Sequence, residues 1–436
     1  MTRAASIASV RFALLATLGA WPCAAIAGEA PAIVVSPNGP VRSLGDAVRQ
    51  APAGSRIVVR AGTYREQPIL IDRPLTIVGE GRPVIEAATP ATLIRVVAND
   101  VRLEGLVLTK IESSHVEDRA GVRFERVTRC AAERLEVLNA PYGIQVSEST
   151  DCRIAGNTIH GAGAGQRAPG NAIHLWNAKR MTVVDNTISG HRDGLYFEFV
   201  QDTTIERNVS ERNLRYGLHF MFSHGCAYRS NRFAHNGAGV AVMYTHDVII
   251  EHNEFLENRG PTAYGLLLKD ISESRLHGNR FQNNTVGLLI EGGGRLAMTA
   301  NRFLGNGWGV KLMANSAGNR FEGNVFDGNS FDMTTNSRST EAVVSGNWWD
   351  RYTGYDFDRD GRGDIPFRPV RLFSLLVATN PSSVVLMRST FVDLLDAAER
   401  TLPVLTPNTL VDKAPLMQIP QVDAPPLDRA QMEMPR

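Results

Sequence analysis

An asparagine followed two residues later by an apolar residue recurs about every 22 residues, at least eight times between Gly143 and Trp349. A second phrase lies between these anchors, a glycine before alternating apolar residues, as in residues 217–220 (GLHF). Alternation with a period of two, bounded by Gly and Asn, indicates short strands and turns. About 22 residues are too few for a propeller blade and suit one coil of three strands. The sequence therefore predicts an all-β fold, a right-handed parallel β-helix of the pectin-lyase-like kind. The anchors are Asn157, Asn186, Asn231, Asn253, Asn279, Asn301, Asn324 and Asn347, with Asn208 as an irregular member.

The anchor asparagines are expected to have a structural role. Asn tolerates left-handed turn geometry and hydrogen-bonds nearby backbone, so one Asn in every coil predicts a stacked ladder. The aromatic residues that follow the anchors are expected to stack beneath it. These residues are Phe255, Phe281, Phe303 and Phe326.

The two ends of the chain differ from the repeat. Residues 1–27 combine two arginines, an apolar run and small residues before Gly28, which is typical of an export signal. Residues 41–51 have helical spacing and predict the cap that a solenoid needs, and residues 382–400 predict a second helix. The predicted organisation is a signal peptide at 1–27, a β-helix at 28–370, and a helical and Pro/Met-rich tail at 371–436.

Charge and hydropathy exclude some classes of partner. The formal net charge is +1, so the charge gives no reason to expect binding to nucleic acid, or a polybasic surface that binds a membrane. After residue 27 no stretch approaches the 18 apolar residues of a membrane span, so we expect a soluble exported protein.

Three cysteines, Cys130, Cys152 and Cys226, each lie five residues before a repeat anchor position, at Leu135, Asn157 and Asn231. That shared position predicts burial in the core. Stacking would place the Cα atoms of Cys130 and Cys152 about 4.8 Å apart, within reach of a disulfide. Buried free thiols are the preferred interpretation, because Cys226 shows that the position accepts an unpaired cysteine.

Two similar phrases, residues 221–224 (MFSH) and 243–246 (MYTH), lie 22 residues apart on the outward face. Stacking would bring together two thioethers and two imidazoles, from Met221, His224, Met243 and His246. Such donors suit Cu(I), whose soft monovalent state prefers polarisable ligands. The alternatives are a partner-docking patch without a metal bond, and a plain structural role. The same face carries His174, Trp176, Tyr196 and His219, which we interpret as part of a docking face.

An acidic loop at residues 356–364 is a second candidate metal site. Its carboxylates, from Asp356, Asp358, Asp360 and Asp364, could surround a hard cation such as Ca²⁺. The loop departs from the EF-hand pattern because its twelfth position is Phe367 rather than Glu. A solvated acidic turn is the alternative.

Many β-helices are polysaccharide lyases, hydrolases or epimerases, which need clustered carboxylates, or a base with an arginine, in a groove. The nearest approach to such a cluster is His191-Arg192-Asp193. A structural turn is the preferred interpretation, so no catalytic residues are assigned.

Several phrases resemble the NosD family. They are residues 217–224 (GLHFMFSH), 242–246 (VMYTH), 347–354 (NWWDRYTG) and 388–396 (RSTFVDLLD). The resemblance implies a non-enzymatic periplasmic protein seated on an ABC transporter, the NosF ATPase and the NosY permease, and touching the membrane only through the permease. It further implies that copper arrives from a NosL-type chaperone and serves the copper centres of nitrous oxide reductase. A carbohydrate-active enzyme on the same fold is the alternative function.

Overall fold

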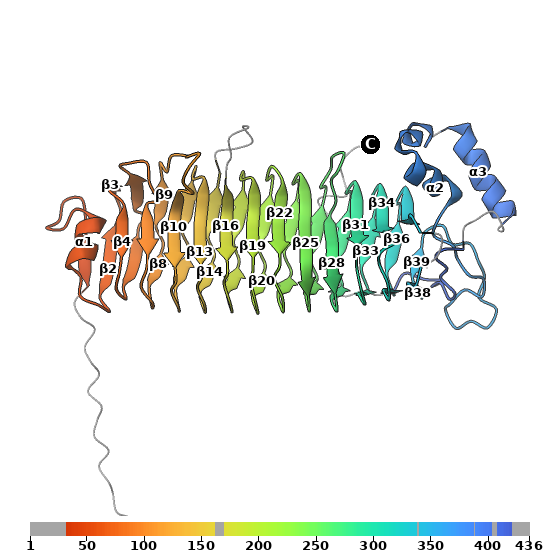
Figure 1. The fold of residues 1–436 in the computed structure, drawn as a ribbon, viewed down its shortest axis with the longest axis horizontal. Coiled ribbons are helices and arrows are strands. Elements are labelled where there is room, and N and C mark those ends of the chain that lie inside the picture. The colour runs from red at the N-terminus through yellow and green to blue at the C-terminus, as the bar shows by residue number, and fades with distance from the viewer. Residues whose placement is uncertain (1–31, 162–169, 338–339, 388, 403–407, 421–436) are drawn as a thin grey trace, which may run out of the picture.

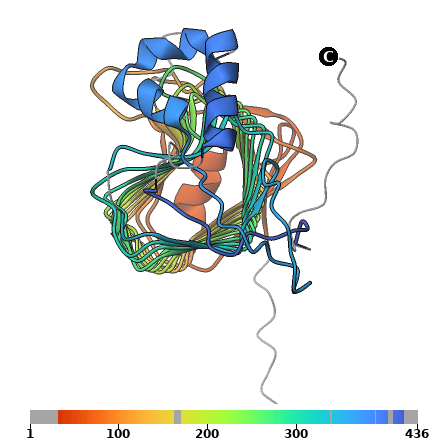
Figure 2. The same ribbon diagram turned by 90° about the vertical axis from the view of Figure 1, so that its right-hand side faces the viewer.

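A computed structural model describes residues 32–161, 170–337, 340–387, 389–402 and 408–420. The predicted signal peptide and the tip of the tail, with Met432 and Met434, lie outside the described residues. The described chain is a long rod of stacked coils (Figure 1). In a view along the rod the coils superimpose, and the C-terminal helices lie beside one corner (Figure 2).

Each regular coil contributes one short strand to each of three parallel sheets, which confirms the predicted right-handed parallel β-helix. One sheet has 14 strands, from β1 (Ile33–Val35) to β38 (Val343–Ser345), and another has 13, from β3 (Thr63–Glu66) to β39 (Trp348–Trp349). The third sheet has 12 strands and carries the candidate sites. Its strands are β4 (Ile69–Ile71), β7 (Ile94–Val96), β10 (Ala120–Glu125), β13 (Tyr142–Ser147), β16 (Asn171–Trp176), β19 (Asp193–Glu198), β22 (Tyr216–Met221), β25 (Ala238–His246), β28 (Leu266–Ser272), β31 (Val286–Glu291), β34 (Trp308–Leu312) and β37 (Phe331–Thr335).

The predicted asparagine ladder runs through the rod. Asn253 is typical: its backbone N–H and its Nδ2 both donate to Oδ1 of Asn279, at 2.9 and 3.0 Å, and Nδ2 also donates to the carbonyl of Tyr228. Asn208 was expected to be irregular, but it bonds to Asn231 in the same way. The irregularity lies two residues later, because Ser210 takes the place of the apolar residue and donates to the carbonyl of Gly217.

A second asparagine ladder was not predicted. It follows the first by five residues and is formed by Asn213, Asn236, Asn258, Asn284, Asn306 and Asn329. Each ladder ends on a buried aspartate. Asp412 accepts from the backbone N–H and Nδ2 of Asn347 and from Nε1 of Trp349, and Asp332 accepts from Nδ2 of Asn329 at 3.3 Å. A side-chain carboxyl group therefore accepts a hydrogen bond from the last asparagine of each ladder.

The aromatic stack beneath the first ladder is confirmed. The ring centroids of Phe255 and Phe281 lie 4.7 Å apart, and those of Phe281 and Phe303 and of Phe303 and Phe326 lie 4.8 Å apart. Trp349 extends the stack at 4.3 Å from Phe326. These spacings follow the distance between neighbouring strands, so each ring packs on the one in the next coil.

A helix caps the N-terminal end of the rod, and further helices lie beside its C-terminal coils (Figure 2). The predicted N-terminal cap is α1 (Leu44–Gln50), whose first turn is capped by the Ser43 hydroxyl accepting from the backbone N–H of Asp46. The single C-terminal helix expected at 382–400 is wrong. The chain forms α2 (Leu372–Thr379), a 3₁₀ segment η1 (Pro381–Leu386) and α3 (Thr390–Thr401). The chain is extended at Ser389, the N-cap of α3, and Phe373 and Val392 from separate helices join Phe331 in one buried cluster.

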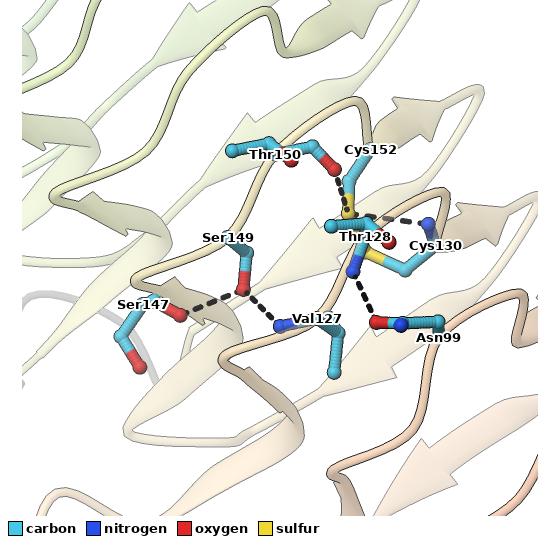
Figure 3. The surroundings of a disulfide bond; sticks show 8 residues. All are labelled: Asn99, Val127, Thr128, Cys130, Ser147, Ser149, Thr150 and Cys152. Atoms are coloured by element: carbon cyan, nitrogen blue, oxygen red, sulfur yellow. Dashed lines mark hydrogen bonds between the residues drawn. A yellow bond between two sulfur atoms is a disulfide. The ribbon is translucent and has the colours of Figure 1, made fainter.

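Cys130 and Cys152 form a disulfide between neighbouring coils, with Cα atoms 4.5 Å apart (Figure 3). The interpretation of both as free thiols is therefore wrong for this pair. Both occupy the same core position in stacked coils, so their side chains meet directly. Cys226 is the free buried cysteine, and burial raises the pKa of its thiol to about 12.

We expect Asp412→Ala to destabilise the last coils, because it leaves the buried donors of Asn347 and Trp349 without their acceptor. The loss in the free energy of unfolding should be about 3 kcal/mol or more. Hydrogen exchange of the coils near β38 and β39, together with urea unfolding, measures it. The matched control is Asp327→Ala, which removes an exposed carboxylate nearby. Equal protection of these coils in both variants would contradict the terminating role of Asp412.

Asp332 should make stability depend on pH. Burial, with a smaller contribution from Asp350, raises its pKa from 3.8 to about 7, so the folded chain favours the protonated form. The free energy of unfolding should therefore fall as pH rises from about 4 to 7. Asp332→Asn keeps a carbonyl for Asn329 and removes this loss, which is at most about 4 kcal/mol. Urea unfolding at pH 5 and 8 tests this, with Asp327→Asn as control; a pH-independent difference between Asp332→Asn and the wild type would contradict it.

Candidate functional site

The two methionines of the predicted copper site are direct neighbours. Met221 ends β22 and pairs in register with Met243 of β25. In the preceding coils the same row holds Trp176 and Glu198, and in the next coil it holds Lys269. Both methionines are half-buried, so their thioethers lie at the surface of the 12-stranded sheet.

His224 and His246 also stack, as the repeat predicted. Their ring centroids lie 4.0 Å apart and their planes differ by 14°. His246 Nδ1 lies 2.7 Å from Oδ2 of Asp247. A carboxylate in this place favours a proton on Nδ1, which leaves the Nε2 lone pair free for a metal. His224 Nδ1 accepts from the backbone N–H of His246 at 3.3 Å, and burial, then the charge of His246, lowers the pKa of His224.

This stacking limits how the two imidazoles can bind an ion. Their nitrogen lone pairs lie in the ring planes, and the planes of His224 and His246 are nearly parallel. Neither ring can therefore direct a lone pair at an ion between them. The pair offers one imidazole, with His246 the better prepared, unless a ring rotates on binding.

An exposed aromatic ridge borders the methionines and was missed by the sequence analysis. It consists of Phe199, Phe222 and Tyr244, each 39–45% exposed. Phe199 stacks on Phe222 at 5.4 Å, and Phe222 on Tyr244 at 5.0 Å. All three have φ near +50°, a conformation that is costly for bulky side chains. Other coils place polar residues or glycine at this turn, namely Glu148, Asn177, Asp270 and Gly292. The Met-Phe and Met-Tyr pairs of the two Met/His phrases were the sequence signal from which this ridge could have been predicted.

The residues of the predicted docking face point outward, as expected, but His219 is buried by its neighbours. His219 is only 7% exposed, and Ala241 in the next coil is fully buried. The rings of Tyr196 and Tyr216 lie 5.2 and 4.7 Å from His219 and shield it. Side chains on neighbouring strands thus cover one another, and burial lowers the pKa of His219 to about 4.

The other three residues of that face, His174, Trp176 and Tyr196, line a groove of about 910 Å³ over the N-terminal half of the sheet. The groove also contains charged residues. Arg192 was considered from the sequence only as part of His191-Arg192-Asp193, and the others are Arg95, Arg119, Arg123, Glu117, Asp118, Glu125 and Glu198. Extending the outward row to the coils before Gly143 would have found Arg95, Arg123 and Glu125, because the strands there keep the same register.

The acidic loop brings together three of its four predicted ligands. Carboxylate oxygens of Asp356, Asp358 and Asp360 lie within 4.8 Å of one another. Asp364 instead accepts from the backbone N–H of Phe357 at 2.7 Å. The other carboxylates also accept backbone N–H groups of the loop, so hydrogen bonds already hold the turn. A calcium site at this loop stays a prediction.

The segment His191-Arg192-Asp193 forms part of the coil wall. His191 and Asp193 are 2% and 0% exposed. Arg192 and Arg215 lie 3.4 and 3.8 Å from Asp193, yet burial outweighs them and raises the pKa of its carboxyl.

Across the described ranges, no helix is long and apolar enough to cross a bilayer.

Known structures support the fold. PfbA, a surface adhesin of Streptococcus pneumoniae, superposes with a TM-score of 0.53 at 11% identity, covering 78% of this chain and 98% of that one. A family 28 exopolygalacturonase of Yersinia enterocolitica gives 0.54 at 10% identity, covering 72% and 78%. At these identities the likeness extends to the fold alone.

The sequence relatives are more informative. A family model described as "Periplasmic copper-binding protein (NosD)" matches residues 163–354, which include both Met/His phrases. A protein of Stutzerimonas stutzeri is 29% identical, covering 83% of this chain and 86% of the relative. A Pseudomonas aeruginosa protein is 28% identical, covering 86% and 91%. Each of the two is named "Probable ABC transporter binding protein NosD". The chain, a parallel β-helix, is thus similar along most of its length to proteins named NosD.

Proposed function

We propose that this chain is a periplasmic, non-enzymatic accessory protein that holds copper transiently as Cu(I) on the patch formed by Met221, His224, Met243 and His246. It receives the ion from a NosL-type chaperone and supports assembly of the copper centres of nitrous oxide reductase. The in-register pairing of Met221 with Met243, beside the His224–His246 stack, is the observation that carries this proposal. The family description and the names of the relatives are consistent with it.

The donor atoms favour a soft ion that can be released. Thioethers and neutral imidazoles bind Cu(I) and discriminate against Ca²⁺ and Mg²⁺. The patch lies at the surface, with Met221 and Met243 half-buried, so an incoming ligand from a partner can reach the ion. The near-parallel imidazoles provide an incomplete coordination shell, which suits a carrier better than a permanent site.

The aromatic ridge of Phe199, Phe222 and Tyr244 is the docking surface for the copper donor and acceptor. Exposed stacked rings at three successive turns form an apolar strip directly beside the methionines. Strain retained at such turns favours a functional role for the rings. A partner that covers the ridge would bring its own ligands beside the copper patch.

The C-terminal helices are the contact with the transporter permease. Their exposed surface is strongly apolar: Val385 is 89% exposed and Leu394 70%, with Leu386, Phe391 and Leu402 between 44% and 55%. Such a patch marks an interaction site. It lies at one end of the rod, so the coils would project from the permease (Figure 1).

The copper site is tested by titrating Cu(I) into the protein against a colorimetric chelator. Met221→Ala/Met243→Ala should lower the affinity at least about tenfold, because it removes both thioethers. His246→Asn should lower it less. Met313→Ala is the matched control, since it removes a half-buried methionine just after β34 of the same sheet. Unchanged affinity in the double variant would leave docking without a metal bond as the role of this face.

The transporter contact is tested with membranes that contain the ATPase and permease. Val385→Glu/Leu394→Glu should reduce co-sedimentation of the protein about tenfold, because two charges would enter an apolar interface. Val34→Glu, a change at an exposed position at the other end of the rod, should have no effect. Retained binding by the double variant would place the contact elsewhere.

A further inference from the structure

We propose that the groove over β4 to β19 binds a neutral oligosaccharide, at a site that borders the copper patch at Glu198 but shares no residue with it. The groove has a volume of about 910 Å³, within the usual range of ligand sites. It follows one face across six successive coils, and residues 116–119 form part of its lining. An elongated site of this kind fits a linear ligand lying along the rod.

The inner strands of the groove, β7 to β19, are paired on both edges, and only β4 ends the sheet. β13, for example, pairs with β10 on one side and with β16 on the other. A peptide therefore cannot bind along these inner strands by adding a strand, which is the usual way in which a sheet receives an extended chain. Recognition in the groove must come from side chains, as in the binding of sugars.

The charges of the groove favour an uncharged ligand. Its lining contains four arginines and four carboxylates. Arg95 donates through Nε and Nη2 to Glu125, at 2.9 and 2.6 Å, and Arg123 Nε donates to Gln145 at 2.8 Å. Such pairs hold donors and acceptors in fixed positions without a net charge to attract a polyanion. Hydroxyl groups, which both donate and accept, match this lining.

Aromatic side chains complete the site. Trp176 is 40% exposed in the groove, and Tyr196, on the following strand, pairs in register with His174. An exposed indole provides a flat surface for the apolar face of a sugar ring. The ring of His174 lies 4.8 Å from that of Tyr196 and 6.0 Å from that of Tyr142.

His174 supplies an unused polar group. Its Nδ1 is buried and meets no hydrogen-bond partner among the described residues. Burial lowers the pKa of His174 to about 4, so the ring is neutral at pH 7 and can donate from one nitrogen and accept at the other. Because Nδ1 is covered, a sugar hydroxyl reaches it only if the His174 ring or a neighbouring tyrosine moves on binding.

The experiment is isothermal titration of the full mature protein with maltohexaose, cellohexaose and chitohexaose, and with hexagalacturonate as the charged probe. At least one neutral hexasaccharide should bind with a Kd at or below about 1 mM. Trp176→Ala and Arg95→Ala should each weaken binding about tenfold, and Trp176→Phe should restore most of it. Circular dichroism shows whether each variant folds. If Trp176→Ala does not fold, Arg95→Ala still tests the proposal, because Arg95 is an exposed residue.

Tyr244→Ala, on the aromatic ridge, is the control and should bind the sugar as the wild type does. The proposal is overturned if no neutral probe binds at 5 mM, on the order of five times the largest expected Kd. It is also overturned if only hexagalacturonate binds, or if Tyr244→Ala loses binding as Trp176→Ala does. Cu(I) affinity is measured in parallel with the same variants and is expected to stay unchanged, so the two sites are judged separately.

Discussion

The asparagine ladder is the interaction on which the rest of this molecule depends. Each buried amide donates through Nδ2 and through its backbone N–H to the next amide, so a coil in the wrong register would leave polar groups unpaired inside the rod. The ladder therefore fixes the axial register of the coils from Asn157 to Asn347. The register in turn decides which outward side chains become neighbours, including Met221 with Met243 and His224 with His246.

Features that depend on the period alone could be predicted from the sequence. The ladder, the stacked Phe255, Phe281, Phe303 and Phe326, and the meeting of the two Met/His phrases all follow from a coil of constant length. The disulfide could not be predicted in this way, because a tolerated thiol at Cys226 says nothing about oxidation of the neighbouring pair. The groove was missed because its lining comes partly from coils before Gly143, where the outward row was not followed, and from residues 116–119, which lie outside the repeat.

The repeat period also does not determine which side chains are exposed, or how the C-terminal helices are arranged. His219 points outward as the alternation required, but rings from neighbouring coils bury it. The break between α2, η1 and α3 depends on packing against Phe331, a contact between segments far apart in sequence. In physical terms, periodicity determines direction, whereas burial depends on what the adjacent coils and loops place over each side chain.

The aspartates at the ladder ends have a consequence for the size of the molecule. Because Asp412 and Asp332 satisfy the terminal donors whatever number of amides precedes them, a coil could be added or removed inside the stack without new end groups. The number of coils is thus free to vary, and it determines how far the methionines lie from the C-terminal helices. Four coil steps separate β25, with Met243, from β37, on which the C-terminal helices pack. At about 4.8 Å per step the rod acts as a spacer that holds the methionines roughly 19 Å from the last strand.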